Sequence, residues 1–463
     1  MLSNKQKNQH LLWRAAFGPM AENSARLEHY TQAELWNLLV SSSKEPCVKI
    51  DVAQNLSDID SKLTAADKRK IRRQYRDDLK NMNLDWLSLM VNSKCQLREK
   101  MSLFWHGHFA CRVVNSYSQQ ELLHVIRTNA LGNFKNLLLA VSKSPSMLQF
   151  LNNQQNRKQH PNENFAREVM ELFTMGRGNY KEQDVKEAAR SFTGWGFNKS
   201  GEFVFRKFQH DDGEKEFLGE KGNFTGDDII RILLEQEQTA YYITEKIYRF
   251  FVNDVVDEKS VKILSKNFFA SGYDITSLLT EIFTSEWFYD PANVGNRIKS
   301  PVELIVGIRR FLPLTMEKEV SQIQLQKGLG QMLFFPPNVA GWPGGKNWID
   351  SSSLMIRLRI PQAFAMNETM DVKFKEDDDL TMGNPEKTLL NRFGSTEIKW
   401  PAVYSIFKNV KKEQLAAGIK ESVLQNTNID TDIIEKFSDK TSRENYIKSM
   451  VIHLMCTPEY QLC

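Results

Sequence analysis

Cysteine is scarce in this chain, and its few cysteines are scattered. The 463 residues include five, none in a Cys-x-x-Cys pair: Cys47, Cys95, Cys111, Cys456 and Cys463. This number and spacing exclude a disulfide framework or a cysteine zinc site and predict reduced, mostly buried thiols. Phosphate-binding glycine motifs and the Gly-x-Ser-x-Gly motif are also missing. The sequence therefore gives no sign of a nucleotide cradle or of a nucleophilic serine.

Long hydrophobic runs are absent as well. None approaches the roughly 18 apolar residues of a membrane-spanning helix. Near the amino terminus, Arg14 ends a short apolar stretch, which leaves no core for a secretory signal. We therefore expect a soluble protein of the cytoplasm.

Neither sign of charge dominates the chain. Its 61 basic and 57 acidic residues give a formal net charge of +4. This near balance provides no whole-protein attraction to nucleic acid or to an anionic membrane. The most basic run, residues 68–76, could contact nucleic acid, but acids placed among its bases at helical spacing favour a solvated helix face.

Helical periodicity dominates the rest of the sequence. Apolar residues recur at spacings of three and four in several segments, which are 118–127, 133–141, 229–251, 260–269 and 274–288. This spacing is typical of amphipathic helices, and the short connections between them favour antiparallel packing. We predict a mainly α fold built on a large multi-helix domain.

One segment departs from this pattern and predicts a small β-hairpin insertion near 202–219. Residues 202–208 resemble a strand, Asp212 and Gly213 form a turn dipeptide, and residues 216–219 would return as the second strand.

The acidic, weakly apolar segment 371–386 is the best candidate for a linker. It would divide the chain into a main helical domain, residues 1–370, and a smaller C-terminal helical part, residues 387–463.

The segment 162–178 carries polar side chains beside the apolar stripe of a predicted helix. Asn164, Arg167, Glu168 and Glu171 border that stripe. Carboxylates that are half removed from water either pair with a cation or bind a metal. Two interpretations therefore stay open: a salt-bridged network around Arg167, or a metal or acid–base site.

Histidines provide the other candidate ligands. In an extended segment, His106 and His108 would point the same way and could reach one ion, and Gly107 permits such an irregular backbone. In a regular helix the two rings lie about 200° apart and could not share an ion. The alternative is one core histidine and one exposed histidine. His210, followed by two aspartates, is a further candidate, although a turn explains that sequence without any function.

The segment 333–345 is rich in proline and glycine, and Trp342 within it offers a ring surface. A rigid loop of this kind can form the floor of a ligand pocket, or it can be a wedge that locks helices together. Both interpretations stay open.

Ordered motifs run through nearly the whole chain, in segments 10–19, 104–109, 130–134, 161–178, 193–195, 210–213, 296–304, 333–348 and 457–461. On these motifs the chain resembles the bacterial family catalogued as domain of unknown function 1800. The resemblance implies one family-length unit and brings no established reaction. Genes of that family often lie beside genes for proteins of an alkaline-phosphatase-like fold, which implies a partner of that fold. Many relatives carry export signals, which this chain does not show. Where the family pattern has Asp-Asn, this chain has Asn152-Asn153.

Two functional hypotheses follow. The first is a metal-dependent enzyme, a hydrolase, whose divalent ion would be held by His106, His108, Glu168 and His210. Glu171 would act as general base on a metal-bound water, and Arg167 would hold an anionic group. Asn164 and Trp342 would contact the substrate.

The second hypothesis is a non-catalytic partner or scaffold protein. Its polar cluster would be structural, and the loop around Trp342 would dock the alkaline-phosphatase-like partner or a glycan. Nucleic-acid binding through residues 68–76 is the weakest of the interpretations.

Overall fold

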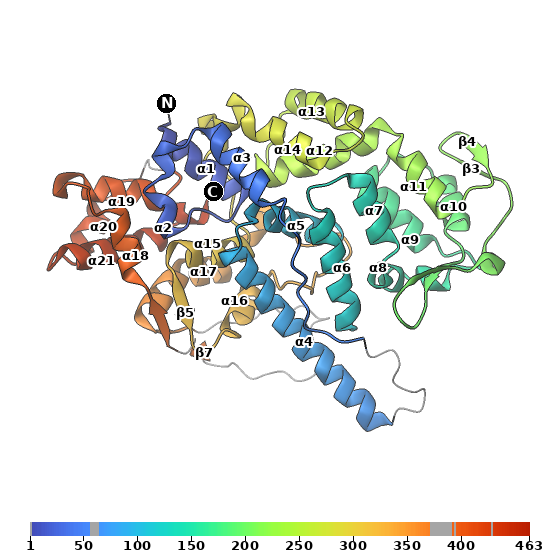
Figure 1. Ribbon diagram of the computed structural model, residues 1–463, viewed down its shortest axis with the longest axis horizontal. Helices are drawn as coiled ribbons and strands as arrows, with labels where there is room; N and C mark the ends of the chain where they lie inside the picture. The colour runs from blue at the N-terminus through green and yellow to red at the C-terminus, as the bar shows by residue number, and fades with distance from the viewer. Residues whose placement is uncertain (1, 56–63, 371–390, 393–394, 427–428) are drawn as a thin grey trace.

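The computed structural model describes residues 2–55, 64–370, 391–392, 395–426 and 429–463. Over these residues the chain forms 21 α-helices and four two-stranded antiparallel sheets (Figure 1). The prediction of a mainly α fold with small β-hairpins is confirmed. No helix in the described part of the chain combines the length and the apolar content needed to cross a membrane.

The helices of the first half are α1 (Asn4–Ala15), α2 (Ala21–Ser24), α3 (Gln32–Ser42), α4 (Ala65–Asn92), α5 (Gln96–His108), α6 (Ser116–Asn129), α7 (Phe134–Ser142), α8 (Pro145–Phe150), α9 (Glu163–Glu168) and α10 (Glu182–Ser191). Those that follow are α11 (Gly226–Leu234), α12 (Glu237–Phe251), α13 (Glu258–Ala270), α14 (Ile275–Thr284), α15 (Pro301–Phe311), α16 (Ser321–Leu329), α17 (Ser351–Met366), α18 (Trp400–Ile406), α19 (Leu415–Val423), α20 (Asp432–Phe437) and α21 (Arg443–Met455). The strands are β1 (Trp195–Phe197), β2 (Phe203–Phe205), β3 (Lys215–Phe217), β4 (Glu220–Gly222), β5 (Leu314–Met316), β6 (Thr369–Met370), β7 (Asn391–Arg392) and β8 (Thr396–Ile398).

The region of the predicted hairpin contains two hairpins instead of one. β2 pairs with the earlier strand β1, and β3 pairs with β4. Leu218 and Gly219 both have positive φ angles, 48° and 88°, between β3 and β4. Two such residues form the tight turn that suits a two-residue hairpin, so the chain reverses after residue 217 and β3 never reaches β2.

Three apolar clusters form the interior. The largest joins α1, α3 and the helices from α5 to α14. A second joins α15, α16 and α17 to α18, α19 and α21, and β5 pairs with β8 across the same region. The helices after residue 395 therefore share a core with α15 to α17. The predicted linker 371–386 lies outside the described residues, and the division into domains at residue 370 stays a prediction.

A third cluster packs the C-terminal half of α4 against Leu333 and Phe334. The buried residues of α4 begin at Asp78, so its first turns are solvated, and Figure 1 shows this end of the helix projecting from the body.

The loop of residues 333–345, which we call the Trp342 loop, crosses over α5. At Gly341, whose φ is +84°, a Cβ atom would lie 2.4 Å from the carbonyl oxygen of Gly107. Only glycine permits this approach together with this backbone conformation. The contact fixes the loop over the end of α5 that carries the two histidines.

Candidate functional site

The histidine pair lies within α5, and Gly107 does not interrupt the helix. The extended conformation that would aim both rings at one ion is therefore not formed, and the rings leave the helix about 200° apart. His106 Nε2 accepts a hydrogen bond from the Phe334 backbone N–H at 3.2 Å, among the rings of Trp86 and Trp342. Burial lowers the pKa of His106 to about 3, so this ring is neutral.

The predicted helix at 162–178 changes geometry midway. Asn162 caps α9 by accepting from the Asn164 amide, and a π-helix follows at Val169–Thr174. Arg167 pairs with Glu182 at 2.7 Å and with Glu163 at 3.1 Å. Hydrogen bonds to Glu182 raise the pKa of Arg167. This arginine thus takes part in a salt-bridged network, one of the two arrangements that the sequence left open.

The two acids of this segment have different surroundings. Glu171 accepts a hydrogen bond from the Tyr180 hydroxyl at 2.7 Å. Glu168 makes no hydrogen bond or ion pair with any described residue. Burial, and then the charge of Glu171, raises the pKa of Glu168.

His210 lies apart, beside the first hairpin. Its Nδ1 donates to the Thr193 carbonyl at 2.9 Å, and the following Asp211 pairs with Arg190 at 2.7 Å. Within the described residues, no three or more histidine, cysteine, aspartate or glutamate side chains are grouped to hold a metal ion. The structure thus does not bring the predicted ligands His106, His108, Glu168 and His210 together.

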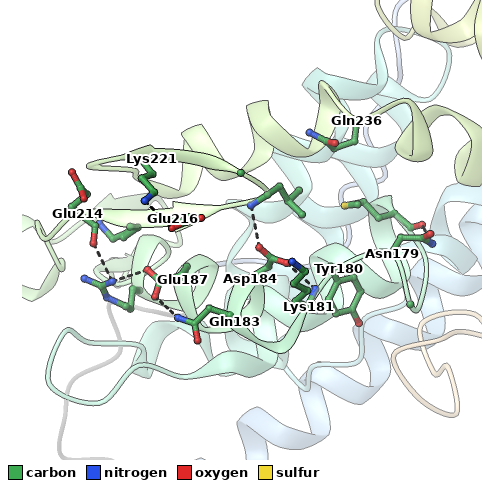
Figure 2. Close-up of a pocket in the computed structure, with 16 residues that line it drawn as sticks. Asn179, Tyr180, Lys181, Gln183, Asp184, Glu187, Glu214, Glu216, Lys221 and Gln236 are labelled. Carbon is green, nitrogen blue, oxygen red and sulfur yellow. Dashed lines mark hydrogen bonds and ion pairs between the residues drawn. The ribbon is translucent and has the colours of Figure 1, made fainter.

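A polar cleft lies between α10 and the β3–β4 hairpin, with a volume of about 1040 Å³. None of the predicted site residues lines it. Several of its polar groups have partners, because Glu187 binds both Gln183 and Arg190, and Asp184 accepts from the backbone N–H groups of Lys181 and Leu218 (Figure 2). These bonds reduce the number of groups that a ligand could use.

A smaller cavity of about 500 Å³, which we call the basic–aromatic cavity, opens between α5, α12 and the Trp342 loop. Its notable lining residues are His108, Lys246, Arg249, Arg297, Trp342 and Trp348. It joins three of the motifs found in the sequence, namely 104–109, 296–304 and 333–348.

Two of the charged groups around this cavity have an acidic partner among the described residues. Arg297 pairs with Glu303 at 3.0 Å, and Arg249 pairs with Glu245 at 2.8 Å. Lys246 has no acidic partner within 4.0 Å among the described residues; its ammonium lies 5.2 Å from the centre of the Tyr242 ring. Burial lowers the pKa of Lys246 to about 8.

His108 lines the same cavity and has an unused nitrogen. Its Nε2 lies 3.2 Å from the Phe173 carbonyl oxygen, which can only accept, so Nε2 carries the proton. Nδ1 is buried and has no hydrogen-bond partner in the described structure. Burial, and then the nearby charge of Lys246, lowers the pKa of His108 well below its usual value. The ring is therefore neutral, and Nδ1 offers a lone pair beside an ammonium group.

Asn164 and Glu168 line a different cavity, of about 760 Å³, which we call the Glu168 cavity. The Trp342 loop separates the two, because residues 335–339 line the Glu168 cavity and Ala340 and Trp342 line the basic–aromatic cavity. The predicted substrate-binding residues Asn164 and Trp342 thus belong to separate sites.

Sequence reasoning missed Lys246 and Arg297. Arg297 lies within motif 296–304, which carried the family resemblance, so this motif could have identified it as a site residue. Lys246 has no local signal, because it is one lysine in an ordinary amphipathic helix, and only the packing of α12 against α5 places it beside His108.

Comparison with known proteins identifies one family. The family model described as protein of unknown function (DUF1800) matches residues 10–462, nearly the whole chain. No curated protein and no solved structure matches the sequence or the fold.

Proposed function

The chain belongs to the DUF1800 family of proteins of unknown function, and we propose that it binds a small organic anion in the basic–aromatic cavity. The observation that carries the proposal is that Lys246 and His108 line one cavity, and that within the described residues Lys246 has no acidic partner and the Nδ1 of His108 has no hydrogen bond. A buried polar atom without a partner is costly, and a ligand that supplies the missing bond recovers that cost.

The two groups call for two features of the ligand. An ammonium group half removed from water favours a carboxylate, phosphate or sulfate. The Nδ1 lone pair accepts a hydrogen bond, so the ligand must also donate one, from a hydroxyl group. A hydroxylated anion meets both requirements at neighbouring positions.

The aromatic residues of the cavity add a requirement for shape. Trp342 is half-buried, Trp348 is buried, and both line the cavity, as does Phe104. Aromatic faces pack against flat or ring-shaped ligands while their edges tolerate polar neighbours. An acidic sugar, with its ring, hydroxyl groups and single negative charge, is the class of ligand that fits best.

Isothermal titration calorimetry on the full chain tests the proposal. The probes are glucuronate, glucose 6-phosphate, glucose and adenosine monophosphate. We expect the two acidic sugars to bind, with glucose at least about tenfold weaker because it lacks the charge that Lys246 would pair with. Tighter binding of adenosine monophosphate would mean that the ligand is a nucleotide and not an acidic sugar. No binding of any anion would refute the proposal.

Two variants assign the binding to the cavity. Lys246→Met removes the ammonium group and keeps most of the chain length, and it should weaken binding of the acidic sugars by about tenfold or more. Lys262→Met removes an exposed lysine of α13 and serves as the matched control. Equal losses in the two variants would show that only overall charge matters.

The metal-dependent hydrolase and the alkaline-phosphatase-like partner stay predictions. The raised pKa of Glu168, which lies in a cavity, favours some acid–base role, as expected for perturbed groups at functional sites. Metal analysis of the purified chain would support the hydrolase if a stoichiometric ion were lost in His106→Ala or Glu168→Ala variants that remain folded.

A further inference from the structure

The projecting end of α4 carries a stripe of exposed basic residues, Arg69, Arg73, Arg76 and Lys80, which we call the α4 basic stripe. Spacings of four, three and four place these residues within about 60° of one another around the helix. At 1.5 Å per residue the stripe extends over about 16 Å. Lys68, Lys70 and Arg72 are exposed on its flanks.

The acids of α4 do little to neutralise this stripe. Asp67 accepts from Thr64 in the capping box, and Asp78 is buried and accepts from Ser116 and Gln74. The single ion pair of the stripe in the described structure joins Lys80 to Asp77 at 3.7 Å, with both side chains about half exposed. Within the described residues, three arginines one helical turn apart therefore have no ion pair.

The stripe leads into the Glu168 cavity. Arg76 and Lys80 line that cavity, together with Arg112 and Lys327 from other segments. The cavity also contains hydrogen-bonding groups, since the carboxyl of Glu168 has no bond to any described residue and the amides of Asn164 and Asn338 line it. The α4 basic stripe thus ends at the Glu168 cavity, whose polar groups can bind hydroxyl groups.

We propose that the α4 basic stripe and the Glu168 cavity bind a linear acidic polysaccharide, with its anionic groups along the stripe and a sugar unit in the cavity. The proposal does not rest on the basic–aromatic cavity, because Pro336, Asn338 and the other lining residues of the two sites are distinct. Charge complementarity identifies a polyanion, and the carboxyl and amide groups identify one that is rich in hydroxyl groups.

Nucleic acid fits this surface less well. Duplex DNA carries a charge about every 1.7 Å along its axis, whereas the stripe provides one cation per turn of about 5.4 Å. Single strands are bound largely by stacking of their bases on aromatic rings. Within α4, no aromatic residue shares the face of the stripe, since Tyr75 lies about 100° from Arg76 and is half-buried. The phenylalanine rings of Phe150 and Phe335 lie at the cavity end only.

Fluorescence anisotropy with the full chain and labelled oligogalacturonate in low salt tests the proposal. The triple variant Arg69→Gln, Arg73→Gln and Arg76→Gln should weaken binding by about tenfold or more and flatten its dependence on salt. The matched control replaces Lys259, Lys262 and Lys266 by glutamine, which removes the same charge from an exposed face of α13. This control should change the affinity by less than about twofold.

The cavity end of the site is tested by Glu168→Leu and by competing polymers. Glu168→Leu removes the hydrogen-bonding carboxyl and should weaken binding of oligogalacturonate by about threefold or more, although it also removes a negative charge. Labelled single-stranded DNA and polyglutamate should bind less tightly than the sugar polymer.

Several results would overturn the proposal. These are no binding by the native chain, equal losses in the two triple variants, tighter binding of oligogalacturonate by Glu168→Leu, or a preference for DNA or polyglutamate. Because calorimetry of the monosaccharides uses the other cavity, failure of one proposal leaves the other standing.

Discussion

Individual ionisable side chains in this protein differ in whether the fold has given them a partner. His106 and Lys246 are both held in low-polarity surroundings that lower their pKa values. His106 has its acceptor satisfied by a backbone N–H, whereas Lys246 has no acid within reach among the described residues. A satisfied group stabilises the fold, and an unsatisfied group in a cavity is available to a ligand.

Binding of acidic sugars should depend on pH through Lys246. Its pKa is about 8 without ligand, so the ammonium form is present below this value and is lost as the pH rises through it. We expect the affinity to fall above pH 8 by up to about tenfold per unit, because each binding event then takes up a proton. The charged and titratable groups that also line the cavity are His108, Arg249, Asp254, Arg297 and Lys346.

Calorimetry between pH 6 and 10 measures this dependence. The variant Lys246→Arg keeps its charge throughout that range and should remove most of the slope. A slope that persists unchanged in this variant would assign the titration to another group.

The variant His106→Phe should affect stability and not ligand binding. It leaves the buried Phe334 N–H without an acceptor, which costs about 1–3 kcal/mol of the free energy of unfolding. Affinity for acidic sugars should stay within about twofold, since His106 does not line the basic–aromatic cavity. Urea unfolding and calorimetry give the two values, and a variant of unchanged stability would contradict this assignment.

At the scale of elements, the site depends on how the Trp342 loop meets α5. Two glycines form the contact, and the structural role of glycine differs between the two positions. Gly341 has a left-handed conformation and touches the Gly107 carbonyl, whereas a Cβ at Gly107 would meet nothing within 4 Å. Geometry requires the first glycine, whereas the second lines the cavity with open space beside it.

Substitution of these glycines by alanine should therefore have opposite effects. Gly341→Ala strains the backbone and pushes the loop off α5, and we expect a loss of about 1–3 kcal/mol in unfolding free energy and weaker binding of acidic sugars. Gly107→Ala should keep or raise stability, by up to about 1 kcal/mol, because alanine favours the helix. Thermal unfolding of both variants measures the difference, and equal destabilisation would show that the loop contact is not a constraint.

At the scale of the whole molecule, a buried ion cluster joins segments that are far apart in sequence. Glu303 at the start of α15 binds Lys100 of α5 and Arg297, all nearly inaccessible to solvent. Lys100 also donates to the Trp13 carbonyl, which adds α1 to the junction. Burial opposes the charged carboxylate, but Arg297 and Lys100 hold the pKa of Glu303 well below its usual value.

Glu303→Gln should destabilise the fold by about 3–5 kcal/mol, since it leaves two buried cations without their counter-ion. Glu235→Gln, in an exposed pair with Arg231 at 2.9 Å, is the control and should cost at most about 0.5 kcal/mol. The depressed pKa means that this contribution is fully present above the unfolded-state value of about 4.3 and is lost progressively as the pH falls from there towards the lower folded-state pKa. Unfolding at pH 7 and pH 4 should therefore show a smaller effect of Glu303→Gln in acid.

The sequence by itself determined the helices and the family. Apolar spacing is a local property, and it placed the helical segments around 118–127 and 260–269 where α6 and α13 occur. It also identified the motifs that line the cavities, because each motif is a short stretch of consecutive residues. It did not determine the conformation of Gly107, which stays helical once α5 packs on both sides, and so the histidine pair diverges.

Tertiary structure alone decided which side chains meet. Lys246 and His108 line one cavity because α12 packs against α5, and the Trp342 loop separates Glu168 from both. The strand at 202–208 found its partner in β1 rather than in the strand that follows, because Leu218 and Gly219 turned that strand back on itself. Contacts of this kind depend on the path of the whole backbone, whereas periodicity depends only on neighbours within a few residues, so the sequence determines the elements and the packing determines the site.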